Sequence, residues 1–221
     1  MIKACIFDLD GTLLDTIESI RYYANKALSN HGIRGITLAQ TKIFVGNGAL
    51  ELIKRSMNAA GVDTEGIEGM SLSHRICEEY RVDYDSNPYY LTEPYKHIKE
   101  SVDELLSRGL KLAVLSNKPD FTVKQLIGHN FKDSFVIVEG ARPDVPLKPD
   151  PSSALSICER LGVLPSETAY FGDTSTDMKT AKNYGAAIAV GVSWGFRDRE
   201  ELIRHGADIV IDSADMIPSV I

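Results

Sequence analysis

The sequence predicts an α/β fold in which a parallel β-sheet carries a helical insert. Short apolar runs are typical of strands that are buried on both faces of a sheet. Amphipathic helical patterns lie between these runs, and strands that alternate with helices indicate a parallel sheet covered on both sides. An insert is indicated because residues from about 15 to about 90 show helical patterns alone. The apolar runs are 4–7, 112–115, 135–138, 169–171, 188–190 and 209–211.

Three helical patterns between the later apolar runs end at a glycine, which commonly stops a helix. Their apolar residues recur every three or four positions, as on one face of a helix. Each pattern therefore predicts a helix that packs on the sheet. The three sets are Ile98, Val102, Leu105 and Leu106 before Gly109; Leu155, Ile157, Cys158 and Leu161 before Gly162; and Met178, Ala181 and Tyr184 before Gly185.

The insert shows apolar stripes at helical spacing. One stripe ends at Gly32, a second ends at Gly61, and a looser one lies around Ile76. Thr37 with Gln40 is typical of a capping box at the start of a helix. Because the insert follows the first strand, it is expected to lie above the carboxyl ends of the strands, where ligands of open α/β sheets bind. We interpret it as a lid.

Length and charge restrict the classes of function. A chain of 221 residues buries about 70% or more of its extended surface and needs no disulfides. The formal charge is −7 and the isoelectric point is about 5.3. Proteins that bind nucleic acid regardless of sequence need a basic face, so we expect no nucleic-acid partner.

The cysteines and the apolar segments predict a cytoplasmic protein without a membrane partner. The three cysteines are isolated, and none has metal-ligand spacing. Cys5 and Cys158 lie in a strand-like and a helix-like run, so we expect them to be small buried hydrophobes. No stretch approaches the about 20 apolar residues of a membrane span. Asp8 and Asp10 come too early for a signal peptide.

Four polar clusters follow strand-like runs. In a parallel sheet the carboxyl ends of the strands meet at one edge, so these clusters are expected to converge. Together they supply carboxylates, a hydroxyl, an amide and an ammonium, which suits phosphoryl transfer. The clusters are Asp8 to Thr12; Ser116 with Asn117; Lys148 before two prolines; and Gly172 to Asp177.

Phosphoryl transfer needs positive charge, because a bare carboxylate is repelled by a phosphate dianion. Mg²⁺ takes carboxylate and backbone oxygens while keeping waters, and Asp8 and Asp173 are placed to hold it. Lys148 offers a fixed positive charge. Ser116 and Asn117 offer donors to the phosphate oxygens.

Each cluster also has a purely structural interpretation. The two N-terminal aspartates begin turns as Asp commonly does, a Ser-Asn pair after a strand is usually a turn or cap, and most lysines are solvated. Asp177 is either a metal ligand, a supporting residue, or only a charge that complements a helix dipole. The presence of all four clusters in order favours the functional interpretation of Asp8, Asp10 and Lys148.

The same clusters carry a resemblance to a known family. The run from Phe7 to Asp15 resembles the first motif of the haloacid dehalogenase (HAD) superfamily hydrolases, and the other three clusters are similar to its remaining motifs in order. The resemblance covers nearly the whole chain and is closest to phosphoglycolate phosphatases. Residues 44–48 and 194–202 are also similar to that group. Thr16 and Thr174 stand where many relatives have serine, but both keep a hydroxyl.

The resemblance implies a Rossmann-like core of the HAD fold, formed by residues 1–14 and 91–221, with a helical cap domain at residues 15–90. It implies that Asp8 is the nucleophile and forms an aspartyl-phosphate. Asp10 would protonate the leaving group and later deprotonate the attacking water. Mg²⁺ would be held by Asp8, Asp10 (through its backbone carbonyl) and Asp173, with Asp177 in support. The implied phosphate-binding residues are Gly11, Thr12, Ser116, Asn117 and Lys148.

The expected function is Mg²⁺-dependent hydrolysis of a small phosphate monoester of the phosphoglycolate kind, by a monomer or weak homodimer. Two alternatives share the scaffold: a sugar-phosphate mutase of the β-phosphoglucomutase kind, and a pyrophosphatase. A third, of another class, is a non-enzymatic phospho-acceptor or binding module. Dehalogenation is disfavoured, because it needs neither Asp10 as a proton shuttle nor a metal at Asp173.

Overall fold

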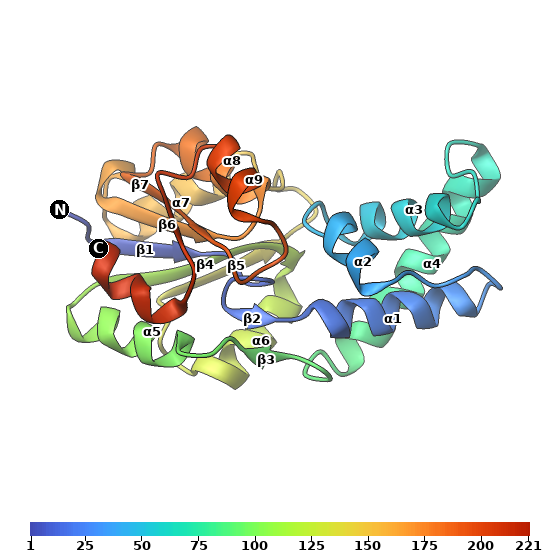
Figure 1. Cartoon of the computed structure of the whole chain (residues 1–221), viewed down its shortest axis with the longest axis horizontal. Coiled ribbons are helices and arrows are strands. Elements are labelled where there is room, and N and C mark those ends of the chain that lie inside the picture. Colours follow the sequence, from blue (N-terminus) through green and yellow to red (C-terminus); the bar gives the residue numbers. More distant parts are fainter. The chain divides into compact units, whose positions relative to one another are not determined.

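The computed structural model describes all 221 residues and contains a six-stranded parallel sheet (Figure 1). The strand order is β5-β4-β1-β6-β7-β8, and all neighbouring strands are parallel. Phe7 of β1 is paired with Val114 of β4 and with Phe171 of β6. This sheet confirms the predicted α/β class. The strands are β1 (Ala4–Phe7), β4 (Lys111–Pro119), β5 (Ile137–Ala141), β6 (Thr168–Gly172), β7 (Ile188–Val192) and β8 (Ile209–Ile211).

Helices cover both faces of the sheet. Alternate residues of each central strand point to opposite sides, and the apolar residues on each side are buried by helices. Cys5 and Phe7 pack with α5 (Ile98–Ser107), α6 (Asp120–Phe131) and the C-terminal 3₁₀ segment η2 (Ala214–Val220). Ala4 and Ile6 pack with the helices of the other face (Figure 1). These are α7 (Ser152–Leu161), α8 (Ser175–Tyr184) and α9 (Arg199–Arg204), and a short 3₁₀ turn, η1 (Pro165–Glu167), leads into β6.

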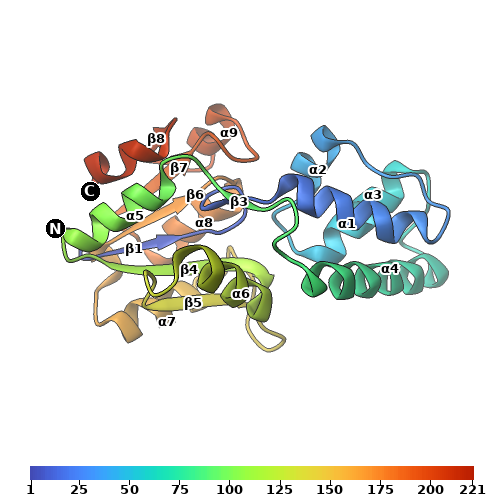
Figure 2. The same cartoon turned by 90° about the horizontal axis from the view of Figure 1, so that it is seen from below.

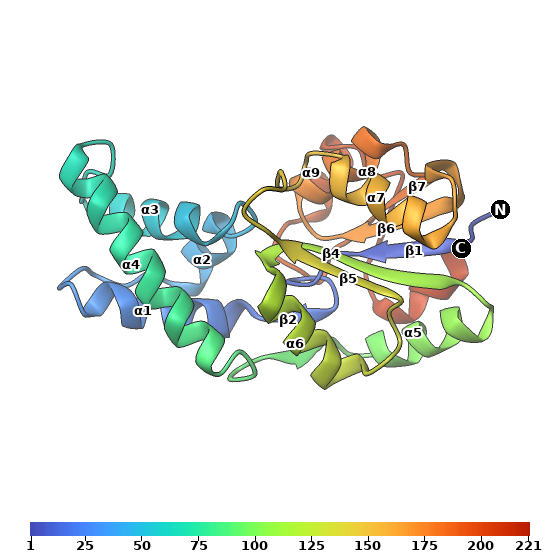
Figure 3. The ribbon, with the colours of Figure 1, turned by 180° about the vertical axis from the view of Figure 1, so that it is seen from behind.

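A second compact unit consists of four helices (Figures 2 and 3). They are α1 (Ile17–Ser29), α2 (Leu38–Phe44), α3 (Ala49–Ala59) and α4 (Ile67–Ser86). The capping box predicted for Thr37 and Gln40 is present at the start of α2. The core of the unit includes Tyr23, Leu28, Ile53, Met57 and Ile76, which are all buried.

The boundary between the two units contains a small antiparallel ladder that the sequence does not predict. Leu14 of β2 (Leu14–Asp15) pairs with Pro94 of β3 (Glu93–Pro94). The sheet unit comprises Met1–Asp15 and Glu93–Ile221, and the helical unit comprises Thr16–Thr92. The predicted limits at residues 14 and 90 therefore lie one and two residues before the observed ones.

The cysteines and the helix lengths bear on two further expectations. Cys5 and Cys158 are buried, as predicted, and Cys77 is buried too; all three are free thiols. None of the helices combines the length and the apolar character that crossing a bilayer requires.

Candidate active site

Two aspartates follow neighbouring strands at the carboxyl edge of the sheet. Asp8 comes directly after β1 and Asp173 directly after β6, and these strands pair in register. The backbone N–H of Asp8 donates to the carbonyl of Phe171 at 2.9 Å, which extends the ladder by one residue. Because the two strands end together, the two carboxylates that follow them lie side by side, as expected for a parallel sheet.

Lys148 lies against the same carboxylates. Its Nζ is 2.8 Å from Oδ1 of Asp8 and 2.7 Å from Oδ1 of Asp177. The side chain is only 4% exposed. Burial lowers the pKa of Lys148, but the charges of Asp177 and Asp8 outweigh it and raise this pKa well above its ordinary value. The ammonium therefore stays charged. Lysines are seldom buried without a partner, and here the two carboxylates are the partners.

Asp8, Asp173 and Asp177 form a compact acidic group whose nearest oxygens lie within 4.8 Å of one another. Burial, with the charge of Asp177, raises the pKa of Asp8 to about 7, against the opposing effect of Lys148. Burial and the charges of Asp177 and Asp8 raise the pKa of Asp173 well above its ordinary value. With Lys148, these three residues form what we call the site cluster.

The site cluster fits a divalent cation. Three buried carboxylates face one ammonium, so the cluster has more negative than positive charge, and buried charges are costly unless they are paired. Carboxylate oxygens are the ligands that Mg²⁺ prefers. The donor set of Asp8 and Asp173, with Asp177 beside them, is therefore suited to a hard cation.

Asp177 is fixed by the start of α8 as well as by Lys148. Its Oδ2 accepts hydrogen bonds from the backbone N–H of Thr174 at 3.0 Å and from the Thr174 hydroxyl at 2.6 Å. Its backbone N–H donates back to that hydroxyl, which completes a capping box. The Tyr170 hydroxyl donates to Oδ1 at 3.3 Å. Asp177 thus positions Lys148 and takes part in the cap at the start of α8. Thr174 supplies the hydroxyl of that cap.

Asn117 holds the backbone of Lys148. Its Oδ1 accepts from the Lys148 N–H at 2.8 Å, and its Nδ2 donates to the Lys148 carbonyl at 3.2 Å. The sequence suggests Asn117 as a phosphate donor, whereas in the structure both ends of its amide bond to Lys148. Ser116 is buried beside it, and its Oγ accepts from the N–H of Lys118 at 3.2 Å. This bond leaves the Ser116 hydroxyl proton available for donation.

Asp173 is held by the loop after β1 and by the segment after β7. The Thr12 hydroxyl donates to its Oδ1 at 3.3 Å, and the Phe196 N–H donates to its Oδ2 at 2.8 Å. Gly11 has φ of +85°, and a Cβ there would lie 2.2 Å from Oδ2 of Asp173. A Cβ on Gly195 would lie 2.4 Å from the Cβ of Asp173. Both glycines are therefore required for Asp173 to occupy this position.

Asp10 is paired with a lysine that sequence reasoning missed. Nζ of Lys118 lies 3.1 Å from Oδ1 and 3.2 Å from Oδ2 of Asp10. Lys118 directly follows Ser116 and Asn117 on β4, and its place in that polar cluster was the available signal. The sequence likewise gives Gly195 no role of its own, because it indicates only that residues 194–202 resemble those of phosphoglycolate phosphatases. The structure thus brings together Asp8, Lys148, Asp173 and Asp177, with Asp10 held by Lys118 nearby in the same loop as Asp8.

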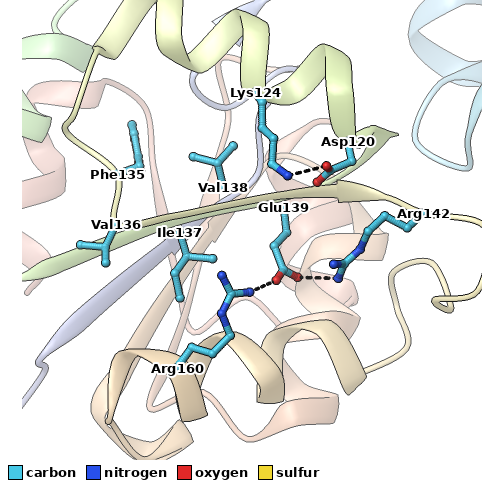
Figure 4. Close-up of a pocket in the computed structure, with 9 residues that line it drawn as sticks. All are labelled: Asp120, Lys124, Phe135, Val136, Ile137, Val138, Glu139, Arg142 and Arg160. Atoms are coloured by element: carbon cyan, nitrogen blue, oxygen red, sulfur yellow. Dashed lines mark hydrogen bonds and ion pairs between the residues drawn. The ribbon is translucent and has the colours of Figure 1, made fainter.

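A charged hollow lies at the outer strand β5 and contains none of the predicted site residues (Figure 4). Its volume is about 340 Å³. Its acids are paired within the hollow: Asp120 with Lys124 at 2.6 Å, and Glu139 with both Arg142 and Arg160. We call these five residues the edge cluster. Because its acids already have cationic partners, the edge cluster offers no surplus carboxylate for a metal or a phosphoryl group.

Two sequence comparisons relate this chain to known proteins. A family model described as haloacid dehalogenase-like hydrolase matches residues 5–190. The chain is 31% identical over 229 residues to the phosphoglycolate phosphatase of Vibrio vulnificus (strain CMCP6), which covers 100% of this chain and 96% of that protein.

Two solved structures extend the likeness to three dimensions. One is a protein of Lactobacillus delbrueckii subsp. bulgaricus predicted to be a phosphoglycolate phosphatase, with a TM-score of 0.91, 30% identity, and coverage of 99% of this chain and 97% of that one. The other is a β-phosphoglucomutase of Clostridium difficile, with a TM-score of 0.73, 22% identity, and coverage of 98% and 93%. The second is similar to this chain in fold alone.

Proposed function

Because this chain belongs to the haloacid dehalogenase-like hydrolase family, we propose that it is a phosphatase that hydrolyses a small phosphate monoester with Asp8 as the nucleophile. The observation that carries the proposal is the buried convergence of Asp8, Lys148 and Asp173 at the carboxyl edge of the sheet. Similarity to a relative named phosphoglycolate phosphatase supports a substrate of the 2-phosphoglycolate kind.

We propose Mg²⁺ as the cofactor. Asp8 and Asp173 would hold it through carboxylate oxygens, together with the backbone carbonyl of Asp10, and Asp177 would support it. The surplus of buried carboxylate over ammonium in the site cluster is the observation that favours a cation there. When bound, the ion would offset the negative charge of the phosphate dianion.

In the first half of the proposed reaction, an oxygen of Asp8 forms a bond to phosphorus while the bond between phosphorus and the ester oxygen breaks. Asp10 gives a proton to the leaving alkoxide, as a general acid. Lys148, which contacts Asp8 at 2.8 Å, is close enough to neutralise charge on the phosphoryl oxygens. Ser116 offers a hydroxyl proton to the same oxygens.

In the second half, a water molecule attacks the phosphorus of phospho-Asp8. Asp10, now a carboxylate, takes the proton of the water, phosphate leaves, and the Asp8 carboxylate is restored. One residue thus serves as acid and then as base, so that the two halves balance. We also propose that the enzyme acts in the cytoplasm as a monomer or weak homodimer on a small metabolite.

The direct experiment compares phosphate release from an aryl phosphate and from 2-phosphoglycolate with and without Mg²⁺. Wild-type protein should depend on Mg²⁺, and Asp8→Asn should lose at least about 10⁴-fold in kcat, because the nucleophile is removed. Asp103→Asn, a change of the same kind at an exposed position of α5, is the matched control and should keep the wild-type rate. Full turnover by Asp8→Asn would remove Asp8 as nucleophile.

Product analysis separates the proposal from its alternatives. A phosphatase releases inorganic phosphate and the free alcohol. A mutase would instead return the phosphoryl group to a sugar, and a pyrophosphatase would act on pyrophosphate in preference to the monoesters. Accumulation of stable phospho-Asp8 without phosphate release would favour a non-enzymatic phospho-acceptor.

A further inference from the structure

The end of β4 carries an irregularity that fixes the backbone of Lys118. The pairing of β4 with β5 shifts register between Leu115 and Pro119, and bulges of this kind redirect side chains near active sites. The neighbouring strand approaches very closely: a Cβ on Gly140 would lie 2.5 Å from the carbonyl oxygen of Lys118. The backbone of Lys118 is therefore held by the sheet.

The Lys118 side chain is directed to the carboxylate of Asp10. Its ammonium contacts both oxygens, at 3.1 and 3.2 Å, and the side chain is 6% exposed against 18% for Asp10. Lys148 makes the contacts to Asp8 and Asp177. The two buried lysines thus contact different acids, and Lys118 contacts the acid that faces the leaving group in the proposed mechanism.

This placement puts a positive charge close to the leaving group. Asp10 must contact the ester oxygen in order to protonate it, and hydrogen bonds measure about 2.7–3.2 Å. Two such contacts in series put the Lys118 ammonium within about 6 Å of the ester oxygen. An anionic group on the carbon next to that oxygen would lie within its reach. A second phosphate at the far end of a sugar ring would not.

We propose that Lys118 is a specificity-determining residue that binds a carboxylate carried by the leaving group. The Lys118 ammonium already contacts one carboxylate, that of Asp10. The carboxylate of an acidic substrate would share the ammonium with Asp10 or replace Asp10 there. The enzyme would then select phosphate esters of short 2-hydroxy acids over esters of neutral alcohols. This inference rests on the proposed phosphatase function.

The experiment compares 2-phosphoglycolate with ethyl phosphate, which has a methyl group where the acid has its carboxylate. Wild-type protein should prefer the acidic ester in kcat/KM. Lys118→Met should lower kcat/KM for 2-phosphoglycolate about 10- to 100-fold more than for ethyl phosphate, because one charge-assisted hydrogen bond is lost. Lys124→Met, a similar change at an exposed lysine of α6, is the control and should leave the preference unchanged.

A binding measurement separates recognition from an effect on Asp10. In the Asp8→Asn background, where no phosphoryl transfer occurs, adding Lys118→Met should weaken calorimetric binding of 2-phosphoglycolate about 10-fold or more and leave ethyl phosphate within about twofold. Circular dichroism of each variant shows whether it is folded; if Lys118→Met does not fold, Lys118→Gln is measured in the same way.

Two outcomes overturn the inference alone: an unchanged preference, or an equal loss for both esters, which would show that Lys118 only positions Asp10. A wild-type protein that releases phosphate from no ester, aryl phosphate included, would instead overturn the proposed function and this inference with it. Normal aryl phosphate hydrolysis with an unaltered preference would contradict only the role of Lys118.

Discussion

Two charged clusters of the sheet unit differ in balance and in position. The edge cluster lies around β5, an edge strand, and each of its acids is paired with at least one of its three cations. The site cluster lies at the ends of β1 and β6, which are inner strands, and has three acids for one lysine. A charged hollow is thus not enough to indicate a site; surplus charge that the fold keeps buried is the more informative feature.

The difference has a physical cost for the site cluster. Holding carboxylates together out of water disfavours their charged forms, and the raised pKa values of Asp8 and Asp173 express this. In the edge cluster, each acid forms ion pairs with the cations beside it, so opposite charges offset one another. Sites often retain groups that reduce stability, because function needs them.

Among the variants that test the site cluster, Gly11→Ala is expected to have the largest effect on activity. The new Cβ would lie 2.2 Å from Asp173, at a φ of +85° that disfavours any side chain, so the carboxylate must move. We expect kcat/KM to fall about 10²-fold or more and the Mg²⁺ requirement to rise, as measured by steady-state kinetics at several Mg²⁺ concentrations.

Gly128→Ala is the matched control for that variant. Gly128 lies in α6, and a Cβ there meets nothing within 4 Å. Its kinetics should equal those of the wild type. Wild-type Mg²⁺ dependence in Gly11→Ala would contradict the close packing of the loop against Asp173.

A smaller effect is expected from Asn117→Ala. The change removes both hydrogen bonds that hold the Lys148 backbone, but it leaves the ion pairs of the ammonium in place. We expect kcat/KM to fall about 30-fold, since two bonds are lost and each contributes roughly 1 kcal/mol to positioning. Asn130→Ala, whose amide bonds only within α6, should keep the wild-type rate. A wild-type rate in Asn117→Ala would show that the Lys148 backbone needs no such support.

The comparison also predicts opposite effects on stability. In EDTA at pH 8, Asp8→Asn should raise the free energy of unfolding by up to a few kcal/mol, because it removes a buried surplus charge. Glu139→Gln should lower that free energy by about 1–2 kcal/mol, because it breaks the ion pairs of a buried acid. Urea unfolding of both variants checks this. A loss of stability in both would show that the clusters do not differ in the way proposed.

The gain in the free energy of unfolding expected for Asp8→Asn should also depend on pH. Because the pKa of Asp8 is raised from about 3.8 to about 7 in the folded protein, the folded state keeps a proton between these values that the unfolded state has lost. Wild-type stability attributable to Asp8 therefore falls as pH rises from about 4 to about 7. The difference between the variant and the wild type should be small at pH 4 and level off above pH 7.

Most of the fold was predictable because it follows from local patterns. The apolar run at 209–211 coincides with β8, and Thr37 with Gln40 caps α2 as its sequence indicates. The β2–β3 ladder was not predictable, since strands of two residues show no periodicity. Its pairing joins Leu14 to Pro94, and nothing near either residue in the sequence identifies the other.

The candidate site was predictable in its composition but not in its contacts. Asp8 and Asp173 follow strands, and their approach depends only on those strands being neighbours. The bonding of Asn117 depends on Lys148, which comes 31 residues later. The pairing of Lys118 with Asp10 depends on the irregular end of β4. Both therefore depend on the three-dimensional course of loops, which spacing along the chain does not encode.

The central claim is that Asp8, one of the three buried carboxylates of the site cluster, attacks phosphorus. The most direct measurement is mass spectrometry of peptides from a reaction with Mg²⁺ and an aryl phosphate that is quenched in acid during turnover. We predict a phosphoryl group on Asp8 in the wild-type protein and none in Asp8→Asn. Rapid phosphate release with no phosphorylated Asp8, or with the group on another residue, would contradict the account.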